Sequence, residues 1–221
     1  MNKTNIEWTD YTWNPLTGCT RGCDYCYARK LAQGRLGDDF TPKVHEDRFE
    51  SGIRKLKSDK MKGAKVFVGS MGDVFDKAFD TPTIDLVIQV ARDFPDTTFQ
   101  FLTKCPIRMN DFTFPKNAWV GVTVENPVAY GHRLAEIKMA NAAIKFVSIE
   151  PIMANFIPDD LAGLNWVIIG CQTGAGAPSR FLRTQDILRT AQAAGVLGIP
   201  VFAKSNTGLE GPKNFPRLKG A

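Results

Sequence analysis

The clearest structural signal in the sequence is Ala118-Trp-Val-Gly-Val-Thr-Val124, which Glu125-Asn-Pro127 follows directly. The apolar run is nearly continuous, which is typical of a strand buried on both faces. Asn followed by Pro is a frequent helix start, and Tyr130, Leu134 and Ile137 then recur on one helical face. We therefore expect a buried strand and a helix, joined by two polar residues.

The same pattern recurs along the chain. Five further apolar runs have this character: Val66–Gly69, Thr98–Leu102, Ile144–Ile149, Trp166–Gly170 and Pro200–Ala203. Helical segments lie between several of them, with starts at Thr81-Pro82 and at Thr184, and we expect another helix from Asp24 to about Arg35. Strands that alternate with helices predict a parallel sheet of the α/β class.

Polar or small residues follow each apolar run. They are Ser70 and Asp73, Thr103 and Lys104, Glu125 and Asn126, Ser148 and Glu150, Cys171 and Gln172, and Lys204 and Ser205. Six such endings predict one shared site at the carboxyl ends of the strands, as in a complete or partial (β/α) barrel. A doubly wound open sheet also collects ligands there, and we prefer the barrel.

The composition describes an ordinary globular protein with a basic excess. The 221 residues are 43% apolar and 23% charged, with a net charge of +5. No apolar run approaches membrane-spanning length and no secretory signal begins the chain, so we expect a cytoplasmic protein without a membrane partner. The stretch from Ala28 to Lys65 has 11 basic and 6 acidic side chains. Either this is a solvated mixed-charge surface, or it faces an anion such as nucleic acid.

Three of the five cysteines, Cys19, Cys23 and Cys26, form a C-x-x-x-C-x-x-C motif. Three thiolates can hold either a zinc ion or three irons of a [4Fe–4S] cluster. A structural zinc site requires a fourth protein ligand, and the nearest histidine, His45, lies nineteen residues beyond the motif. An iron without a protein ligand can bind a substrate, so we favour the cluster and keep zinc as the alternative.

The motif Cys19-Thr-Arg-Gly-Cys-Asp-Tyr-Cys26 resembles the signature of the radical S-adenosylmethionine superfamily. This resemblance implies that Cys19, Cys23 and Cys26 hold a [4Fe–4S] cluster whose open iron binds S-adenosylmethionine. One electron then cleaves the sulfonium, and a 5′-deoxyadenosyl radical removes a hydrogen atom from the substrate. It further implies a partial barrel of about six parallel strands plus one extra. The sequence pattern itself predicts an insertion near residues 37–62, which fit neither the strand nor the helix pattern, and a short basic tail over residues 206–221.

Other phrases are similar to a poorly characterised, phage-associated branch of that superfamily. They are Ile6–Pro15, Val68–Asp73, Leu102–Lys104, Val122–Asn126, Ser148–Pro151 and Trp166–Gly170, and the similarity runs from about Asn5 to Ser205. Cys105 and Cys171 depart from the pattern of the branch, so no role carries over to them. A phage-encoded member would act in the host cytoplasm.

The resemblance also implies which residues bind the cofactor. These are Tyr25, Ser70, Asp73, Thr123, Glu125, Asn126, Gly170 and Gln172. Plainer roles remain open for four of them: Tyr25 as packing beside the cluster, Asp73 as a turn cap, Asn126 as a helix N-cap, and Gly170 as a turn former.

Substrate-side candidates come from the strand ends. Glu150, Lys104 and Lys204 would orient a charged substrate or move protons, or would form salt bridges across the barrel top. Cys171 would donate a hydrogen atom to a product radical, or is a small buried hydrophobic residue.

The basic stretch, the basic tail and the phage-associated branch together favour a DNA or nucleotide substrate. We predict rearrangement of a modified thymidine base in phage DNA, an isomerase- or lyase-like reaction, with flavodoxin or ferredoxin as the electron donor. The alternatives are the same chemistry on a small molecule or peptide, a lyase that repairs DNA lesions, and a zinc-stabilised nucleic-acid-binding module without catalysis.

Overall fold

The computed structural model describes residues 1–152, 160–172 and 184–217. The main sheet has the order β1-β2-β5-β6-β7-β8-β9-β10. Its strands are β1 (Asn2–Lys3), β2 (Tyr11–Trp13), β5 (Lys65–Val68), β6 (Thr98–Thr103), β7 (Ala118–Val124), β8 (Ile144–Ile149), β9 (Trp166–Ile169) and β10 (Val201–Ala203). All neighbours from β2 to β10 pair in parallel, and β1 pairs antiparallel with β2.

The strand order follows the sequence without reversing, which is the order of a barrel and not of a doubly wound sheet. The six predicted strands are confirmed, and β2 is the parallel strand that the apolar runs did not reveal. Because the sheet ends at β10 without pairing to β1 among the described residues, the barrel is partial.

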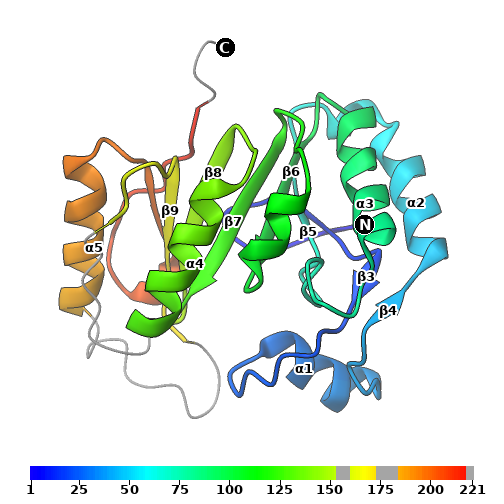
Figure 1. Cartoon of the computed structure of the whole chain (residues 1–221), viewed down its shortest axis with the longest axis horizontal. Helices are drawn as coiled ribbons and strands as arrows, with labels where there is room; N and C mark the ends of the chain where they lie inside the picture. The colour runs from blue at the N-terminus through cyan, green and yellow to red at the C-terminus, as the bar shows by residue number, and fades with distance from the viewer. Residues whose placement is uncertain (153–159, 173–183, 218–221) are drawn as a thin grey trace.

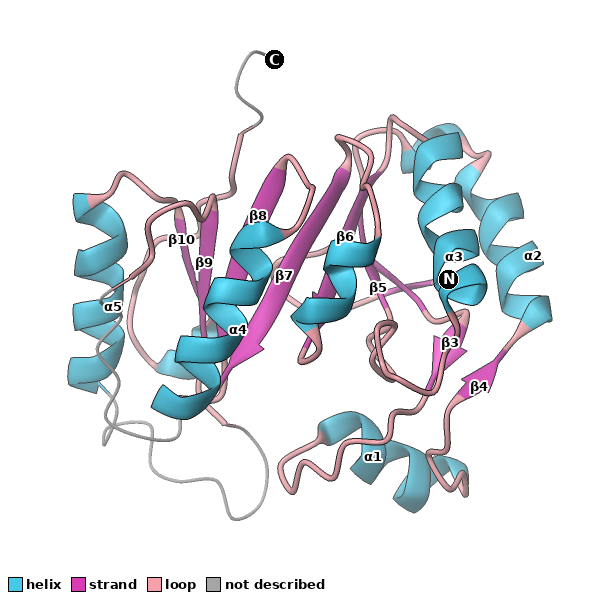
Figure 2. Ribbon diagram, in the orientation of Figure 1, coloured by secondary structure: helices cyan, strands magenta, loops and turns pink. Residues whose placement is uncertain are grey.

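The helices are α1 (Tyr27–Leu31), α2 (Glu46–Leu56), α3 (Thr81–Asp93), α4 (Pro127–Met139) and α5 (Thr184–Val196). Figure 1 shows α4 in front of the sheet, with α2, α3 and α5 at its sides. Figure 2 shows α1 apart from the others, below the carboxyl ends of the strands. No helix in the described part of the chain has the length and apolar character that crossing a bilayer requires.

Alternating side chains along each strand divide the core into two clusters. One cluster joins strand residues such as Val120 to helix residues such as Leu134, and so lies under the helices. The other contains Trp8 and strand residues only, among them Phe146 and Trp166, and so fills the barrel interior. Gly121 belongs to that interior, because a Cβ atom there would lie 2.4 Å from the Phe146 ring.

The two ends of the chain meet at the open side of the barrel. The Glu7 carboxylate accepts hydrogen bonds from Ser205 N at 2.9 Å and from Lys213 Nζ at 2.5 Å. Lys213 also pairs antiparallel with Phe202 of β10, and Phe215 packs on Trp166. Lys213, expected at a DNA-facing rim, is therefore bound to a carboxylate instead.

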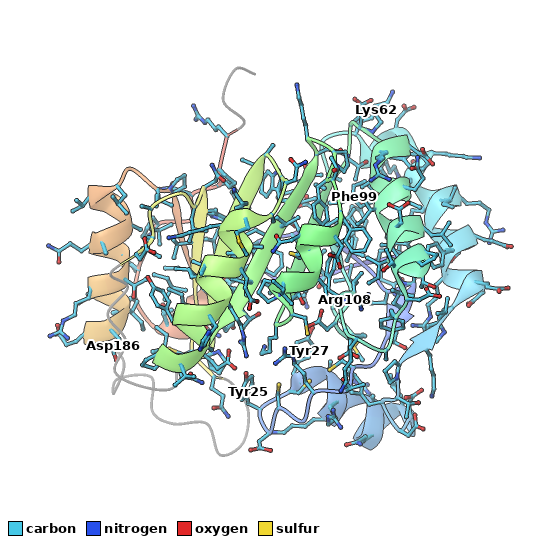
Figure 3. All side chains as sticks on the ribbon, in the orientation of Figure 1. Tyr25, Tyr27, Lys62, Phe99, Arg108 and Asp186 are labelled. Atoms are coloured by element: carbon cyan, nitrogen blue, oxygen red, sulfur yellow. The ribbon has the colours of Figure 1, made fainter. Side chains whose placement is uncertain are left out.

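The predicted insertion at residues 37–62 contains β4 (Lys43–Val44), α2 and a short 3-10 helix, η2 (Asp59–Met61). The strand β4 pairs with β3 (Leu16–Thr17), and α2 is the crossover helix between parallel strands β2 and β5. This segment thus supplies the crossover between β2 and β5 and one strand of the small β3–β4 sheet. It carries the chain away from the carboxyl ends, so that Lys62 lies at the opposite edge from Tyr25 and Tyr27 (Figure 3).

Candidate functional site

A cavity of about 410 Å³ opens at the carboxyl ends of the strands. Most of the residues singled out in the sequence line it: Cys19, Cys23, Cys26, Tyr25, Ser70, Asp73, Lys104, Thr123, Glu150, Cys171, Gln172 and Lys204. Its wall on the side of the barrel interior is apolar and includes Ile6, Trp8, Phe67 and Leu102. The fold therefore brings the cysteine motif and the ends of six strands, β5 to β10, into one site.

A close backbone crossing holds the cysteine loop against the end of β5. Gly18 forms a parallel bridge with Gly72, with Gly18 N donating to Met71 O at 2.9 Å and Asp73 N donating to Gly18 O at 3.3 Å. A Cβ atom on Gly72 would lie 2.5 Å from Gly18 O, so only glycine allows this approach. Gly18 itself has φ of +77°.

Two charged side chains fix the rest of the loop. Asp76, which is 1% exposed, accepts hydrogen bonds from Thr20 N at 2.9 Å and from the Thr20 hydroxyl. The Arg29 guanidinium donates to the carbonyls of Cys19 and Arg21. The loop is therefore shaped before any ligand binds.

The environment of the cysteines fits a metal cluster. The Cys26 thiol is the N-cap of α1 and accepts from Arg29 N at 3.4 Å. Burial, and then the Asp73 and Asp76 carboxylates, raise the pKa of Cys19 to about 11, so a positive charge is needed to stabilise its thiolate. The described residues contain no group of three His, Cys, Asp or Glu side chains placed for a single metal ion.

Unpaired polar atoms also surround the loop. Arg21 Nε and the Tyr25 hydroxyl are buried and have no hydrogen-bond partner among the described residues. Buried polar groups are normally paired, so these atoms indicate space for a polar ligand beside the cysteines. Burial and then the nearby Glu125 carboxylate raise the pKa of Tyr25, which keeps its phenol protonated.

Asp73 joins two strand ends. Its Oδ1 accepts from the Thr103 hydroxyl at 2.6 Å and from Phe75 N at 3.1 Å, and its Oδ2 accepts from Lys104 N at 2.9 Å. Burial raises the pKa of the carboxyl, against these three hydrogen bonds. Asp73 therefore has the capping role, and a carboxylate with four lone-pair sites can also accept one further donor from a ligand.

Glu150 and Lys204 form an ion pair inside the cavity. Their Oε1 and Nζ atoms lie 2.5 Å apart, and each side chain is less than a quarter exposed. Gly170 makes this pairing possible, because a Cβ atom there would lie 2.7 Å from the Glu150 carboxyl carbon. The small size of Gly170 therefore leaves room for this ion pair.

Asn206 connects the Glu150–Lys204 pair to the backbone of Cys171. It donates to Cys171 O at 2.8 Å, accepts from Cys171 N at 3.1 Å, and lies 3.4 Å from Glu150 Oε1. Cys171 is buried and lines the cavity. Its sulfur is therefore held at a fixed place beside the Glu150–Lys204 pair.

Lys104 has no ion-pair partner among the described residues. Its Nζ lies 5.5 Å from the centre of the Tyr25 ring, within the range of a cation–π contact. Ser70 donates its hydroxyl to Asn14 Oδ1 at 3.1 Å and accepts the Tyr27 hydroxyl at its carbonyl. These residues connect the cysteine loop to the second and third parallel strands.

Three predicted cofactor residues do not line the main cavity: Gly170, which lies beside the Glu150–Lys204 pair, and Glu125 and Asn126. Glu125 forms an ion pair with Arg133 at 2.7 Å, and Asn126 is the N-cap of α4, accepting from Ala129 N at 2.9 Å. Both line a second, shallower cavity that shares Tyr25 with the first. The N-cap alternative for Asn126 is confirmed.

Sequence reasoning missed several residues that shape the site, including Asn14, Asp76, Arg133 and Asn206. Only Asn14 gave a signal, as part of the Ile6–Pro15 phrase. Cys105 accepts from Arg21 Nη2 at 3.1 Å and does not join the three cysteines in the cavity lining. Gln172 lines both cavities, and the residues that follow it, 173–183, lie outside the described part of the chain.

The fold is shared with spore photoproduct lyase. A structure of that enzyme complexed with dinucleoside spore photoproduct matches with a TM-score of 0.58 and 14% identity, over 76% of this chain and 57% of that chain. A double mutant with bound AdoMet and dinucleoside spore photoproduct matches with a TM-score of 0.55 and 16% identity, over 68% and 48%.

The chain thus spans about half the length of these neighbours, and at such identity the likeness concerns the fold alone. A search among curated proteins found no significant match. Residues 3–208 match the family described as protein of unknown function, DUF5131. The chain with this three-cysteine cavity therefore belongs to the DUF5131 family.

Proposed function

We propose that this protein is a radical S-adenosylmethionine enzyme that acts on a base in DNA. The observation that carries the proposal is the shared cavity, in which Cys19, Cys23 and Cys26 face the polar ends of parallel strands. A neighbour of the same fold binds AdoMet, which supports the cofactor.

The three cysteines would hold a [4Fe–4S] cluster. When bound, such a cluster supplies the electron that cleaves S-adenosylmethionine to methionine and a 5′-deoxyadenosyl radical, which then takes a hydrogen atom from the substrate. Asp73, Ser70 and Thr123 would hold S-adenosylmethionine through carboxylate, hydroxyl and carbonyl oxygens. Glu125, Asn126, Gly170 and Gln172 remain proposed cofactor residues whose contacts are to neighbouring protein groups or to the second cavity.

The Glu150–Lys204 pair would act on the substrate side. In a cavity with an apolar wall, an ion pair is a source of fixed charge that can align a polar substrate group or hold a proton in place. Lys104 offers a second amine without a carboxylate partner among the described residues. Cys171 lies next to the pair and would supply a hydrogen atom to a product radical.

A modified thymidine base in phage DNA is the substrate that we favour. The resemblance to a phage-associated branch supports it. The structural neighbours, which bind a dinucleoside spore photoproduct, support a nucleic-acid substrate in general and favour the second candidate, the cleavage of a DNA lesion. A base in DNA would have to leave the helix to reach this cavity.

The proposal is tested by anaerobic purification. Iron and sulfide in the wild-type protein, lost in Cys26→Ser and retained in Cys105→Ser, would support the cluster, whereas zinc alone would support a binding module without catalysis. The reduced protein is then incubated with S-adenosylmethionine and candidate DNA. We expect 5′-deoxyadenosine together with a changed nucleoside by mass spectrometry. If 5′-deoxyadenosine forms without any change in the nucleosides of any candidate DNA, the DNA assignment is wrong, and the small-molecule or peptide alternative takes its place.

A further inference from the structure

Helix α1 packs on the protein through its smallest side chains. Ala28 and Ala32 are buried against Phe40, one helical turn apart. The large residues of the segment point outward: Tyr27 is 58% exposed and Leu31 is 37% exposed. An amphipathic helix normally buries its large apolar residues, so this arrangement leaves a surface that needs a partner.

Tyr27 is exposed and yet fixed. Its hydroxyl donates to the carbonyl of Ser70, and burial of that hydroxyl raises the pKa of Tyr27. The ring also lines the mouth of the main cavity. An aromatic ring that is anchored at one end and open on its face can stack on a flat ligand without losing further rotational freedom.

Two cations continue this surface along the chain. Lys30 and Arg35 are exposed and have no ion-pair partner among the described residues, whereas Lys43 is bound to Asp38 and Asp39. Arg35 lies eight positions beyond Tyr27, in the π-helix Ala32–Leu36 that continues α1, and at the α-helical rise this separation is at most about 12 Å. We call Tyr27, Lys30, Leu31 and Arg35 the α1 stripe.

We propose that the α1 stripe binds the single polynucleotide strand that delivers a base to the cavity. This inference rests on the proposed function and adds the surface that holds the substrate backbone. An aromatic ring followed by unpaired cations is the combination that binds single strands by base stacking and phosphate contact. Arg29 and Lys43 do not serve this purpose, because Arg29 donates to carbonyl oxygens of the cysteine loop and Lys43 is bound to two carboxylates. Lys62, at the end of the basic stretch, lies at the opposite edge of the molecule (Figure 3).

The test measures binding of a fluorescent single-stranded oligonucleotide to the whole protein over a range of salt concentrations. The double variant Lys30→Ala/Arg35→Ala removes both cations of the stripe. Because each phosphate contact to a single strand contributes about 0.7 to the slope of log K against log salt, we expect the slope to fall by about 1.4. The matched control, Lys57→Ala/Lys60→Ala, removes two exposed lysines that lie outside the stripe and should leave the slope unchanged.

Tyr27 is tested separately. Removal of an aromatic ring that stacks on a base should weaken binding about 5- to 100-fold in Tyr27→Ala. Tyr27→Phe keeps the ring and should lose much less.

The outcomes separate this inference from the proposed function. Cleavage of S-adenosylmethionine without DNA should be normal in Lys30→Ala/Arg35→Ala, because neither side chain lines the cavity. If that variant and its control bind DNA with equal slopes, the stripe inference is wrong even where the enzyme modifies DNA. If the variant binds DNA normally and instead accepts electrons more slowly from an acidic redox protein, the stripe belongs to the electron donor. If the wild-type protein cleaves no S-adenosylmethionine, the proposed function itself is wrong.

Discussion

Replacing Gly72 by alanine tests whether its close backbone contact with Gly18 holds the cysteine loop in place. Gly72 does not have a positive φ, so alanine fits its backbone conformation. The added Cβ atom would nevertheless lie 2.5 Å from Gly18 O and 2.7 Å from Gly18 N. Both are main-chain atoms, so no side-chain rotation can relieve the contact, and the loop itself must move.

The size of the effect follows from these distances. Ordinary van der Waals contact begins at 3.4 Å, so Gly18 O must retreat by about 0.9 Å, the difference between 3.4 and 2.5 Å. That shift weakens two backbone hydrogen bonds, each worth about 0.5–1.5 kcal/mol. Alanine restores about 0.4–1 kcal/mol by restricting the unfolded chain. We expect Gly72→Ala to lower the free energy of unfolding by about 1–2 kcal/mol.

Urea unfolding of the metal-free protein measures this loss, and a melting temperature lower by about 2–8 °C should accompany it. The iron content after anaerobic purification should also be lower in Gly72→Ala, because the displaced loop moves the cysteines. The matched control is Gly131→Ala in α4, where a Cβ atom meets nothing within 4 Å, and which should be stabilised by about 0.5–1 kcal/mol. Gly22 lies inside the cysteine motif but also in open space, so Gly22→Ala should unfold like the parent.

A Gly72→Ala variant with parental stability and full iron would refute the reasoning. It would mean that the crossing does not hold the cysteine loop. Loss of iron in Gly131→Ala would likewise show that iron content does not report on this loop.

Three further predictions concern the cavity, and a fourth concerns the open side of the barrel. Replacing any motif cysteine, as in Cys26→Ala, should abolish iron binding, as measured by iron analysis. Cys171→Ala should keep the iron but form no modified nucleoside, as measured by mass spectrometry. Asp73→Asn should lose about 1–3 kcal/mol of stability, because an amide nitrogen then faces backbone N–H donors, and should also suppress 5′-deoxyadenosine formation. Glu150→Gln should still form 5′-deoxyadenosine slowly while yielding little product, and the opposite pattern in these two variants would reverse their assigned roles. Burial raises the pKa of Glu7, but hydrogen bonds from Lys213 and Ser205 lower it by more, so the pKa in the folded protein is below 4.5. This carboxylate therefore stabilises the fold above pH 4.5, and the stabilisation is lost as the pH falls through the pKa of the folded protein. Glu7→Gln should therefore be less stable at pH 7, and its urea midpoint should change less on acidification.

The fold was predictable because the apolar runs are long and regular. Six strands were found from Val66 onward, and Asn126-Pro127 marked the start of α4 correctly. β2 was missed because it has only three residues, Tyr11–Trp13, which are too few for a periodic pattern. The start of α3 at Thr81 was also correct, although the N-cap that accepts from Thr83 N is Asp80 and not Thr81.

The site was predictable in outline and not in its contacts. Parallel strands must end at one edge, so Asp73, Lys104, Glu150 and Lys204 had to lie near one another. Which of them pair depends on distances between strands that the sequence does not encode locally. Asn206 illustrates this limit, because its role comes from reaching a backbone group 35 residues away.

The alternation of side chains along the strands explains why charged residues line the cavity directly next to the aromatic residues of the barrel interior. Along β8, Phe146 faces the barrel interior, and counting by two leads to Ser148 and then to Glu150. The same count along β10 leads from Phe202 to Lys204. In both strands the interior column therefore runs from an aromatic ring to a charged group at the cavity. Because the aromatic layers exclude water from below, the Glu150–Lys204 charges interact more strongly than they would at a surface, and a reactive substrate held above them is protected from solvent on that side.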